Sequence, residues 1–265
     1  MKNKRNALVV SVEQLASDVF SIWIKDEEIT DNGKPGQFVS IYCRNQIRLL
    51  PRPISICEIN REEGLVRFVY RVVGKGTEEL SKLKVSDSIQ ILGPLGNGYR
   101  LKGKNVLIVG GGIGIPPLLE LTKRLDAEKS IILGYRDELF LNKDFEHYGK
   151  VYISTENGSV GTKGNVIDAI IANNLLDNSK VDSDSGSNID MIFACGPVPM
   201  LRGLKEFANK NNIKLQVSLE ERMACGVGVC LSCVCKTKEK DSYTNVHNTR
   251  ICCEGPVFDA NEVDF

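Results

Sequence analysis

The chain has 265 residues, 42% of them hydrophobic, which is enough for ordinary cores in one large domain or two to three small ones. Its 34 basic residues balance 34 acidic ones, so the composition gives no sign of a nucleic-acid-binding protein. The first apolar run turns polar at Ser11, too early for a signal peptide, and the longest, residues 106–119, is too short to cross a bilayer. We therefore expect a soluble, cytoplasmic protein.

The first region, residues 1–100, is predicted to form a small antiparallel β-barrel. Short β-rich runs recur there and are separated by turn residues such as Asn32 and Gly33. One short helix is expected in this region, at 76–83. The expected strands are 7–12, 19–25, 37–42, 54–59, 65–71 and 88–92.

The second region, residues 101–219, alternates strands with helices, a pattern that predicts a parallel, doubly wound α/β sheet. Its first strand is apolar, ends in glycines and precedes a helix that starts near Pro117. The polar stretch 178–188 is expected to be a mobile surface loop. The expected strands are 106–110, 130–135, 150–155, 190–195 and 214–219, and the expected helices are 117–125, 165–173 and 199–211.

The third region, residues 220–265, is too small to hold together on hydrophobic burial alone. It contains six of the nine cysteines: Cys225, Cys230, Cys233, Cys235, Cys252 and Cys253. Cysteines crowded in this way in a cytosolic chain more often bind metal than form disulfides. The whole chain is therefore predicted to be an α+β multidomain protein, with a barrel, an α/β domain and a small C-terminal metal-cluster domain.

The cysteine spacing, Cys225-x4-Cys230-x2-Cys233-x18-Cys252, matches the plant-type pattern for a [2Fe–2S] cluster. A tight loop can supply three of the four thiolates, and its glycines let backbone N–H groups point at the sulfurs. A zinc site or a set of buried free thiols is the alternative. Zinc sites favour paired C-x2-C units, whereas only one such unit stands here before a lone distant cysteine.

Two cysteines of this region are surplus to a four-thiolate cluster. Alternation along a strand would point Cys235 the same way as Cys233, which makes Cys235 the closest mimic of a ligand. Cys253 adjoins Cys252 and is the rival for the fourth position. The spacing favours Cys252 and leaves Cys253 open.

Three segments of the barrel together predict a flavin site. An arginine beside a strand can pair with a pyrophosphate, and a glycine followed by threonine opens a short helix whose N–H groups suit a phosphate. An Arg-Pro pair alone also occurs at ordinary strand edges, so the prediction depends on the three segments together. The candidate residues are Arg52, Pro53, Ile54, Ser55, Val69, Tyr70, Arg71, Gly76 and Thr77.

The glycine-rich loop 110–117 follows a buried strand and opens a helix, the context in which such a loop contacts a nucleotide. Pro116 stands where the usual fingerprint has its third glycine, and no acidic residue occupies the usual ribose position. A tight strand-to-helix turn is therefore the alternative, and Cys195 could equally be a buried thiol. The candidate nicotinamide-nucleotide residues are Gly111, Gly112 and Gly114 in the loop, with Cys195, Gly196 and Pro197 at the same sheet edge.

With these motifs in this order, the chain resembles the ferredoxin-NADP reductase superfamily. Within it, the chain is most similar to the electron-transfer subunits of type B, NAD-dependent dihydroorotate dehydrogenases. The resemblance runs over nearly the whole sequence. Besides the motifs above, it rests on segments 93–98, 218–223, 250–252 and 255–258.

The resemblance implies an FAD-binding domain at 1–100, an NAD-binding domain at 101–219 and a [2Fe–2S] domain at 220–265. In that family the arginine-proline tetrad, the 69–71 segment and the Gly76–Thr77 pair contact FAD. The family's fourth cluster ligand precedes an acidic-Gly-Pro-Val-Phe tail by one residue. That position falls on Cys252 here, with Cys253 as the spacer.

The resemblance also implies a route for electrons in pyrimidine biosynthesis. A catalytic subunit with FMN in a (β/α)8 barrel oxidises dihydroorotate, and electrons pass through the [2Fe–2S] cluster and FAD to NAD+. FAD converts between one- and two-electron chemistry. The expected assembly is a heterotetramer with two copies of each subunit. This chain alone should turn over no dihydroorotate, since neither of its two histidines lies in a motif and no catalytic residue is assigned.

Two other functions remain open at this point. The chain could serve another NAD(P)H:acceptor complex of the same superfamily, linked to ferredoxin or sulfur, or it could be a non-enzymatic redox sensor or cluster carrier. A carrier would need neither the flavin tetrad nor the glycine loop. For the coenzyme we expect NAD rather than NADP, because Asp137 beside Arg136 would repel a 2′-phosphate.

Overall fold

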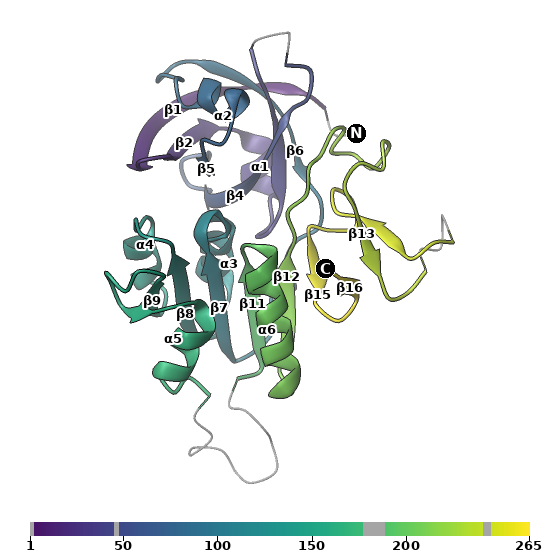
Figure 1. The fold of residues 1–265 in the computed structure, drawn as a ribbon. Coiled ribbons are helices and arrows are strands. Elements are labelled where there is room, and N and C mark those ends of the chain that lie inside the picture. The colour runs from purple at the N-terminus through teal and green to yellow at the C-terminus, as the bar shows by residue number, and fades with distance from the viewer. Residues whose placement is uncertain (1–2, 45–47, 177–188, 241–244) are drawn as a thin grey trace.

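The computed structural model describes residues 3–44, 48–176, 189–240 and 245–265. Along the chain it shows a closed β-barrel, a seven-stranded sheet flanked by helices, and a small three-stranded sheet (Figure 1). This confirms the predicted fold class. The expected surface loop at 178–188 lies outside the described residues.

The barrel has six strands in the order β1-β2-β5-β4-β3-β6, and every pairing is antiparallel. Side chains alternate along the strands, so Ile22, Ile41 and Phe68 fill the barrel and are fully buried. The strands are β1 (Arg5–Ala16), β2 (Val19–Lys25), β3 (Phe38–Tyr42), β4 (Arg52–Asn60), β5 (Leu65–Arg71) and β6 (Ser88–Leu95).

The described residues of the barrel region form two helices, so the prediction of a single helix there was wrong. The expected one is α2 (Lys75–Leu80), and the missed one is α1 (Glu27–Asn32). Asp26 caps α1 by accepting a hydrogen bond from Ile29 N at 2.9 Å. An aspartate followed by two glutamates is a start signal for a helix, but the turn residues Asn32 and Gly33 led the sequence analysis to expect only a turn here.

The second sheet has the order β10-β9-β8-β7-β11-β12-β15. All its pairings are parallel except the last, where β15 runs antiparallel to β12. From the sequence, the α/β region was expected to end at residue 219. In the structure, β15 from the C-terminal tail adds one more strand to the sheet of that region. The strands are β7 (Asn105–Gly111), β8 (Glu128–Tyr135), β9 (Lys150–Thr155), β10 (Thr162–Lys163), β11 (Met191–Cys195), β12 (Lys214–Ser218) and β15 (Val257–Asp259).

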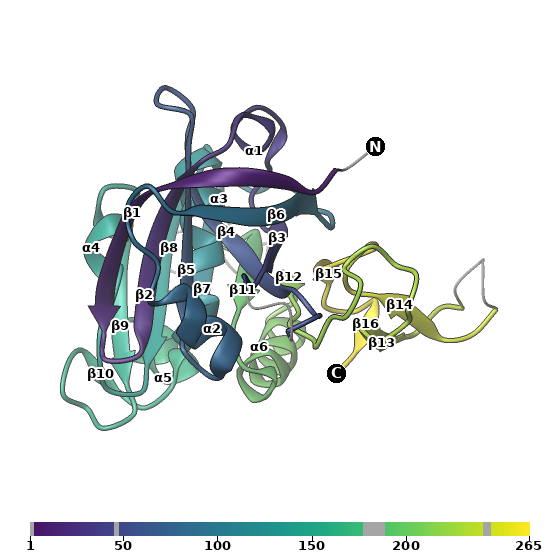
Figure 2. The ribbon, with the colours of Figure 1, turned by 90° about the horizontal axis from the view of Figure 1, so that it is seen from above.

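Helices cover both faces of this sheet. Leu107 and Val109 of β7 share one core with α5 (Val166–Ala172) and α6 (Val198–Lys210). The alternate residues of β7 share the other core with α3 (Leu119–Arg124) and α4 (Asn142–Glu146). Figure 2, seen from above, shows the barrel lying across this layered unit.

The glycine loop does not lead straight into a helix. Two 3-10 turns, η1 (Gly112–Gly114) and η2 (Pro116–Leu118), stand between β7 and α3. The helix expected from Pro117 therefore begins two residues later, at Leu119. Neither Pro116 nor Pro117 has the backbone N–H that a hydrogen bond to the preceding turn would need.

The C-terminal unit holds an antiparallel sheet in the order β14-β13-β16, formed by β13 (Val234–Thr237), β14 (Asn248–Arg250) and β16 (Val263–Asp264). Its apolar residues, Cys233 and Cys252 among them, belong to a core that also includes Phe38 and Leu95 of the barrel. The unit therefore does not build its core alone. Among the described residues no helix is long and apolar enough to span a membrane.

Candidate functional site

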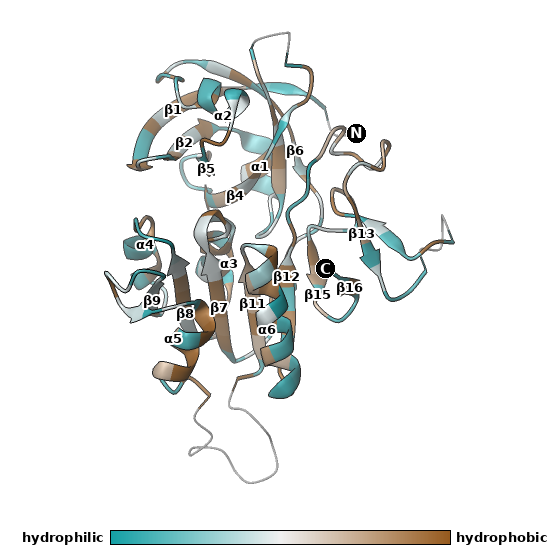
Figure 3. Cartoon of the chain, in the orientation of Figure 1, coloured by the Kyte–Doolittle hydropathy of each residue, from teal (hydrophilic) through white to brown (hydrophobic). Residues whose placement is uncertain are grey.

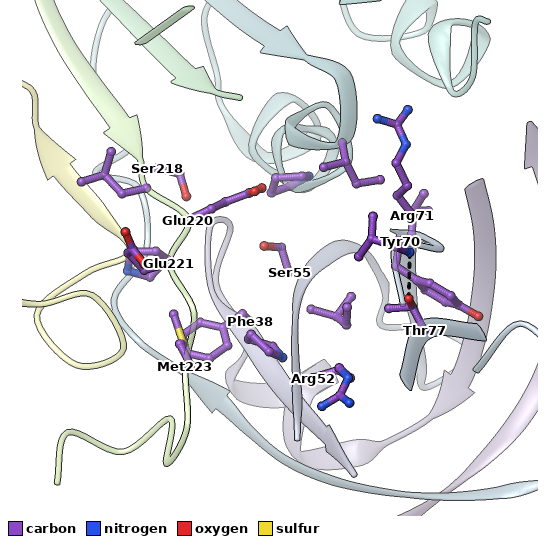
Figure 4. A pocket seen from close by; sticks show the side chains of 18 residues that line it. Phe38, Arg52, Ser55, Tyr70, Arg71, Thr77, Ser218, Glu220, Glu221 and Met223 are labelled. Atoms are coloured by element: carbon purple, nitrogen blue, oxygen red, sulfur yellow. Dashed lines mark hydrogen bonds between the residues drawn. The ribbon is translucent and has the colours of Figure 1, made fainter. Parts of the chain in front are cut away.

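A cavity of about 360 Å³ lies where the barrel, the glycine loop and the end of β12 meet (Figure 4). Its volume is within the range of small-molecule sites, roughly 300–1,000 Å³. Most of the predicted flavin residues line it. They are Arg52, Pro53, Ile54, Ser55, Val69, Tyr70, Arg71 and Thr77.

Arg52 opens β4 at the rim of this cavity. Its Nη1 donates to the carbonyl of Leu50 at 2.7 Å, which orients the guanidinium. The remaining predicted flavin residue, Gly76, does not line the cavity but lies directly against this guanidinium, so that a Cβ at Gly76 would collide with it. Glycine at position 76 thus makes room for the arginine, and the two motifs form one structural feature.

Thr77 holds the turn that precedes α2. Its Oγ1 accepts a hydrogen bond from Val73 N at 3.0 Å (Figure 4), and it donates one to Gly74 O, also at 3.0 Å. The hydroxyl of Tyr70 is buried and has no hydrogen-bond partner in the described part of the chain. Burial raises the pKa of Tyr70, which keeps this hydroxyl protonated. A buried polar group without a partner is uncommon in proteins and is suited to a ligand.

The glycine loop packs against the end of β11, as the parallel register of Gly110 opposite Cys195 requires. A Cβ at Gly114 would stand 2.5 Å from the backbone of Cys195, and one at Gly111 would stand 3.2 Å from Cδ of Pro197. The sequence-predicted nucleotide residues are therefore brought together. None of them lines the cavity, which the same loop reaches through Ile113 and Pro117.

Cys195 is only 1% exposed. Burial, together with the nearby Glu220 carboxylate, raises the pKa of the Cys195 thiol, although a hydrogen bond with Ser218 opposes the change. The thiol is therefore protonated at neutral pH. Cys195 is thus a buried thiol, which was one of the two interpretations that the sequence left open.

The wall opposite the barrel comes from residues to which the sequence analysis gave no role. They follow β12 or lie at its end, and Figure 4 shows Glu220 extending from this segment while Ser55 comes from the barrel. Burial raises the pKa of the Glu220 carboxyl. The only signal for these residues was the 218–223 segment of the family resemblance. The residues are Ser218, Leu219, Glu220, Glu221 and Met223.

The four predicted cluster cysteines form two pairs. The thiol of Cys225 contacts that of Cys230, and the thiol of Cys252 contacts those of Cys233 and Cys253. In the described part of the chain, no three Cys, His, Asp or Glu side chains converge as they would around a single ion. A two-iron cluster places two of its four thiolates on each iron, so two pairs fit it better than a mononuclear zinc site.

The first pair sits in a loop whose backbone points at sulfur. The N–H groups of Val227 and Val229 donate to Cys225 Sγ at 3.4 and 3.3 Å. Burial raises the pKa of Cys225, but these hydrogen bonds and those from Cys230 outweigh it and lower the pKa to about 6. The loop thus favours the thiolate form that binds iron.

The second pair is buried, with Cys233 and Cys252 each 2% exposed. Cys253 is exposed, and its Sγ lies 3.9 Å from that of Cys252. Cys235 lies within β13, where burial raises its pKa to about 11. Because Cys252 is buried beside Cys233, it is favoured over Cys235 and Cys253 as the fourth cluster ligand.

Comparison with known proteins gives consistent relatives. Residues 220–264 match the family model described as the iron-sulfur cluster binding domain of dihydroorotate dehydrogenase B. The dihydroorotate dehydrogenase B (NAD(+)) electron transfer subunit of Fusobacterium nucleatum subsp. nucleatum is 42% identical, with 95% of each chain covered. The protein with the same name from Caldanaerobacter subterraneus subsp. tengcongensis is 41% identical, with 100% of each chain covered.

A solved structure agrees in fold over the whole chain. It is that of an NADH-dependent reduced ferredoxin-NADP oxidoreductase, reported for flavin-based electron bifurcation. The match has a TM-score of 0.81 and 28% identity, and it covers 100% of this chain and 91% of the other.

Proposed function

The chain belongs to the family of dihydroorotate dehydrogenase B (NAD(+)) electron transfer subunits, and from this premise we propose how it carries electrons between a catalytic subunit and NAD+. The observation that supports the proposal is the position of Phe38. Its side chain lines the cavity beside Arg52, and it also belongs to the core that contains Cys233 and Cys252. The flavin cavity therefore borders the apolar core that buries two of the predicted cluster cysteines.

FAD is the flavin that fits the barrel side of the cavity. Arg52 offers a guanidinium fork to the pyrophosphate, Ser55 and Tyr70 offer hydroxyl groups, and Thr77 lines the cavity while its hydroxyl holds the turn before α2. When bound, FAD exchanges single electrons with an iron–sulfur cluster and a hydride with a nicotinamide. Gly76 contributes by leaving space for Arg52.

NAD binds, in this proposal, along the carboxyl edge of the parallel strands. Gly111, Gly112 and Gly114 let a nucleotide approach the backbone closely, and Cys195, Gly196 and Pro197 form the neighbouring edge. Ile113 and Pro117 connect this edge to the cavity, so a nicotinamide held there would reach the flavin site.

Cys225, Cys230, Cys233 and Cys252 are proposed to ligate the [2Fe–2S] cluster. The first pair faces outward, since Cys230 is exposed, while the second pair is buried in the core that also contains Phe38 and Leu95. This orientation suits a cluster that takes electrons from outside and delivers them inward. Cys235 and Cys253 are left out of the ligand set.

The chain has an exposed apolar surface near Cys225 and Cys230 that a partner subunit could bind. Val227, Val229 and Leu231 are exposed in the cysteine loop, residues 225–233, and Val229 is 79% exposed. In Figure 3 the segment between β12 and β13 is hydrophilic where it leaves β12 and becomes largely hydrophobic further on. We propose that these three residues, named here the apolar loop surface, contact an FMN-containing catalytic subunit, with two copies of each chain in the assembly.

The test uses the purified chain, handled without oxygen. Flavin released by denaturation should be FAD, and the reduced protein should give the EPR signal of a [2Fe–2S] cluster. NADH should be oxidised with an artificial acceptor. FMN, or no flavin, would refute the FAD site, and a loaded protein that leaves NADH unoxidised would favour the sensor or carrier.

A matched pair of variants tests the Arg52–Gly76 contact. Gly76→Ala places a methyl group against the guanidinium, so the protein should fold but retain much less FAD. Gly74→Ala is the control, because a Cβ there has no heavy atom within 4 Å and its φ of −177° suits any residue. Equal FAD content in the two variants would contradict the role assigned to Arg52.

A further inference from the structure

Ser40 has a buried hydroxyl group without a partner. Its neighbours in β3, Val39 and Ile41, fill the barrel core, so alternation directs Ser40 outward. It is nevertheless only 1% exposed. Its Oγ has no hydrogen-bond partner among the residues that the structure describes. A segment outside the barrel therefore covers this side chain but gives its hydroxyl no hydrogen-bond partner.

The cysteine loop provides that cover. A Cβ added to Gly226 would lie 2.8 Å from Ser40 Oγ and 3.5 Å from Cδ1 of Leu95. Gly226 follows Cys225 directly and adopts a φ of +69°, which lets the next N–H groups turn toward the Cys225 sulfur. The unpartnered hydroxyl therefore sits against the inner side of the loop that carries the proposed cluster ligands.

Ser40 also adjoins the flavin motif. In the antiparallel pairing of β3 and β4 it stands opposite Pro53 of the arginine-proline tetrad. Phe38, two residues earlier on the same side of β3, lines the flavin cavity. Ser40 is thus a hydroxyl of the flavin-binding barrel that reaches the cysteine loop.

We propose that the Ser40 hydroxyl donates a hydrogen bond to a sulfur of the cluster held by this loop. The inference rests on the proposed [2Fe–2S] site and adds a positioning residue to it. Reduction adds negative charge to the cluster sulfurs, and a donor stabilises that charge. Ser40 therefore raises the reduction potential of the cluster, since hydrogen bonds to the sulfurs are among the factors that set it. It also fixes the loop on the barrel strand that borders FAD.

The test is the Ser40→Ala variant of the full chain, purified with its cofactors. Iron and FAD content should match those of the wild type, while the midpoint potential of the cluster shifts to a more negative value. The potential is measured by anaerobic dye-equilibrated titration followed by EPR, and the flavin potential should stay unchanged. A fully loaded Ser40→Ala protein with the wild-type cluster potential would overturn the proposal.

Ser21→Ala is the matched control. Ser21 is another buried serine of the barrel, on β2, and its hydroxyl already accepts from Arg67 Nε at 2.9 Å. This variant should keep the wild-type cluster potential. A cluster potential shifted as far in Ser21→Ala as in Ser40→Ala would also overturn the proposal.

Two further measurements test the proposal if the Ser40→Ala variant loses its cluster. If Ser40→Ala loses iron, Ser40→Thr, which keeps the hydroxyl, should retain it, and equal loss in both variants would contradict the donor role. After iron removal, Ser40→Ala should unfold at no lower temperature than the wild type, because its hydroxyl has no protein partner. A lower temperature would mean that the hydroxyl bonds the protein itself. A wild-type chain with no [2Fe–2S] signal would instead refute the cluster assignment.

Discussion

The side-chain amide of Asn97 pairs with both backbone groups of Val257. Its Nδ2 donates to Val257 O at 2.7 Å, and its Oδ1 accepts from Val257 N at 3.0 Å. Nδ2 also donates to Glu254 O, and the backbone N–H of Asn97 donates to Gly255 O. Asn97 follows the last barrel strand and Val257 opens β15. Through these side-chain and backbone bonds, Asn97 ties the C-terminal tail, and the cysteines before it, to the barrel.

Replacing Asn97 should loosen this attachment. Asn97→Ala leaves two carbonyls and one N–H of the tail without partners, and we expect it to lower the free energy of unfolding by about 2–4 kcal/mol. Chemical denaturation measures the change. The control is Asn6→Ala, at an exposed position of β1, which should change stability by less than about 0.5 kcal/mol. Equal effects of the two substitutions would show that the Asn97 contacts do not hold the tail.

The cysteine assignment predicts a sharp contrast between adjacent residues. Cys252→Ser should lose most of the iron, because a buried thiolate that faces Cys233 is removed. Cys253→Ser and Cys235→Ser should keep both the iron and the EPR signal. Iron analysis of the three variants decides the matter. If Cys253→Ser loses the cluster while Cys252→Ser keeps it, the fourth ligand has been assigned to the wrong residue.

Coenzyme choice should depend on Asp137, which is exposed just after β8. Repulsion of a 2′-phosphate by about 1.4 kcal/mol would make the KM for NADPH about tenfold higher than that for NADH. Asp137→Asn should narrow this gap, whereas Asp126→Asn, at the opposite end of β8, should leave it unchanged. Steady-state kinetics with both coenzymes provide the test, and a lower KM for NADPH in the wild type would reverse the assignment.

The apolar loop surface should control association with the catalytic subunit. Val229→Lys places a charge at its most exposed residue, and we expect binding to weaken by about 1–2 kcal/mol or more. Ile171→Lys is the control, since Ile171 is 62% exposed on α5, far from the cysteine loop (Figure 1). Calorimetry with the catalytic subunit measures both. An unchanged affinity for Val229→Lys would mean that the partner binds elsewhere.

Local sequence signals predicted the elements that depend on neighbouring residues. The strands 19–25, 65–71 and 150–155 have the expected bounds, because turn residues flank each apolar run. Helix α1 was missed because Asn32 and Gly33 marked the segment between two predicted strands as a turn. The antiparallel place of β15 beside β12 depends on contacts with a strand far earlier in the chain, which periodicity cannot report.

The residues of the candidate site also fall into two groups, those that the sequence identified and those that only the fold reveals. Arg52 and Cys225 stand in motifs whose spacing carries chemistry, so the sequence identified them. Phe38, Ser40 and Glu220 stand in no such pattern. Phe38 and Ser40 matter because the fold brings a barrel strand against the cysteine loop, and Glu220 because the end of β12 faces the barrel. Those relationships exist only in three dimensions.

The central claim, that this chain transfers electrons but does not oxidise dihydroorotate, is tested most directly by reconstitution. The loaded chain is mixed with dihydroorotate and NAD+ without oxygen, and then the FMN-containing catalytic subunit is added while orotate and NADH are followed together. We predict neither product before the addition, and equal amounts of both after it. Orotate formed by the isolated chain, or orotate without NADH in the mixture, would contradict the account.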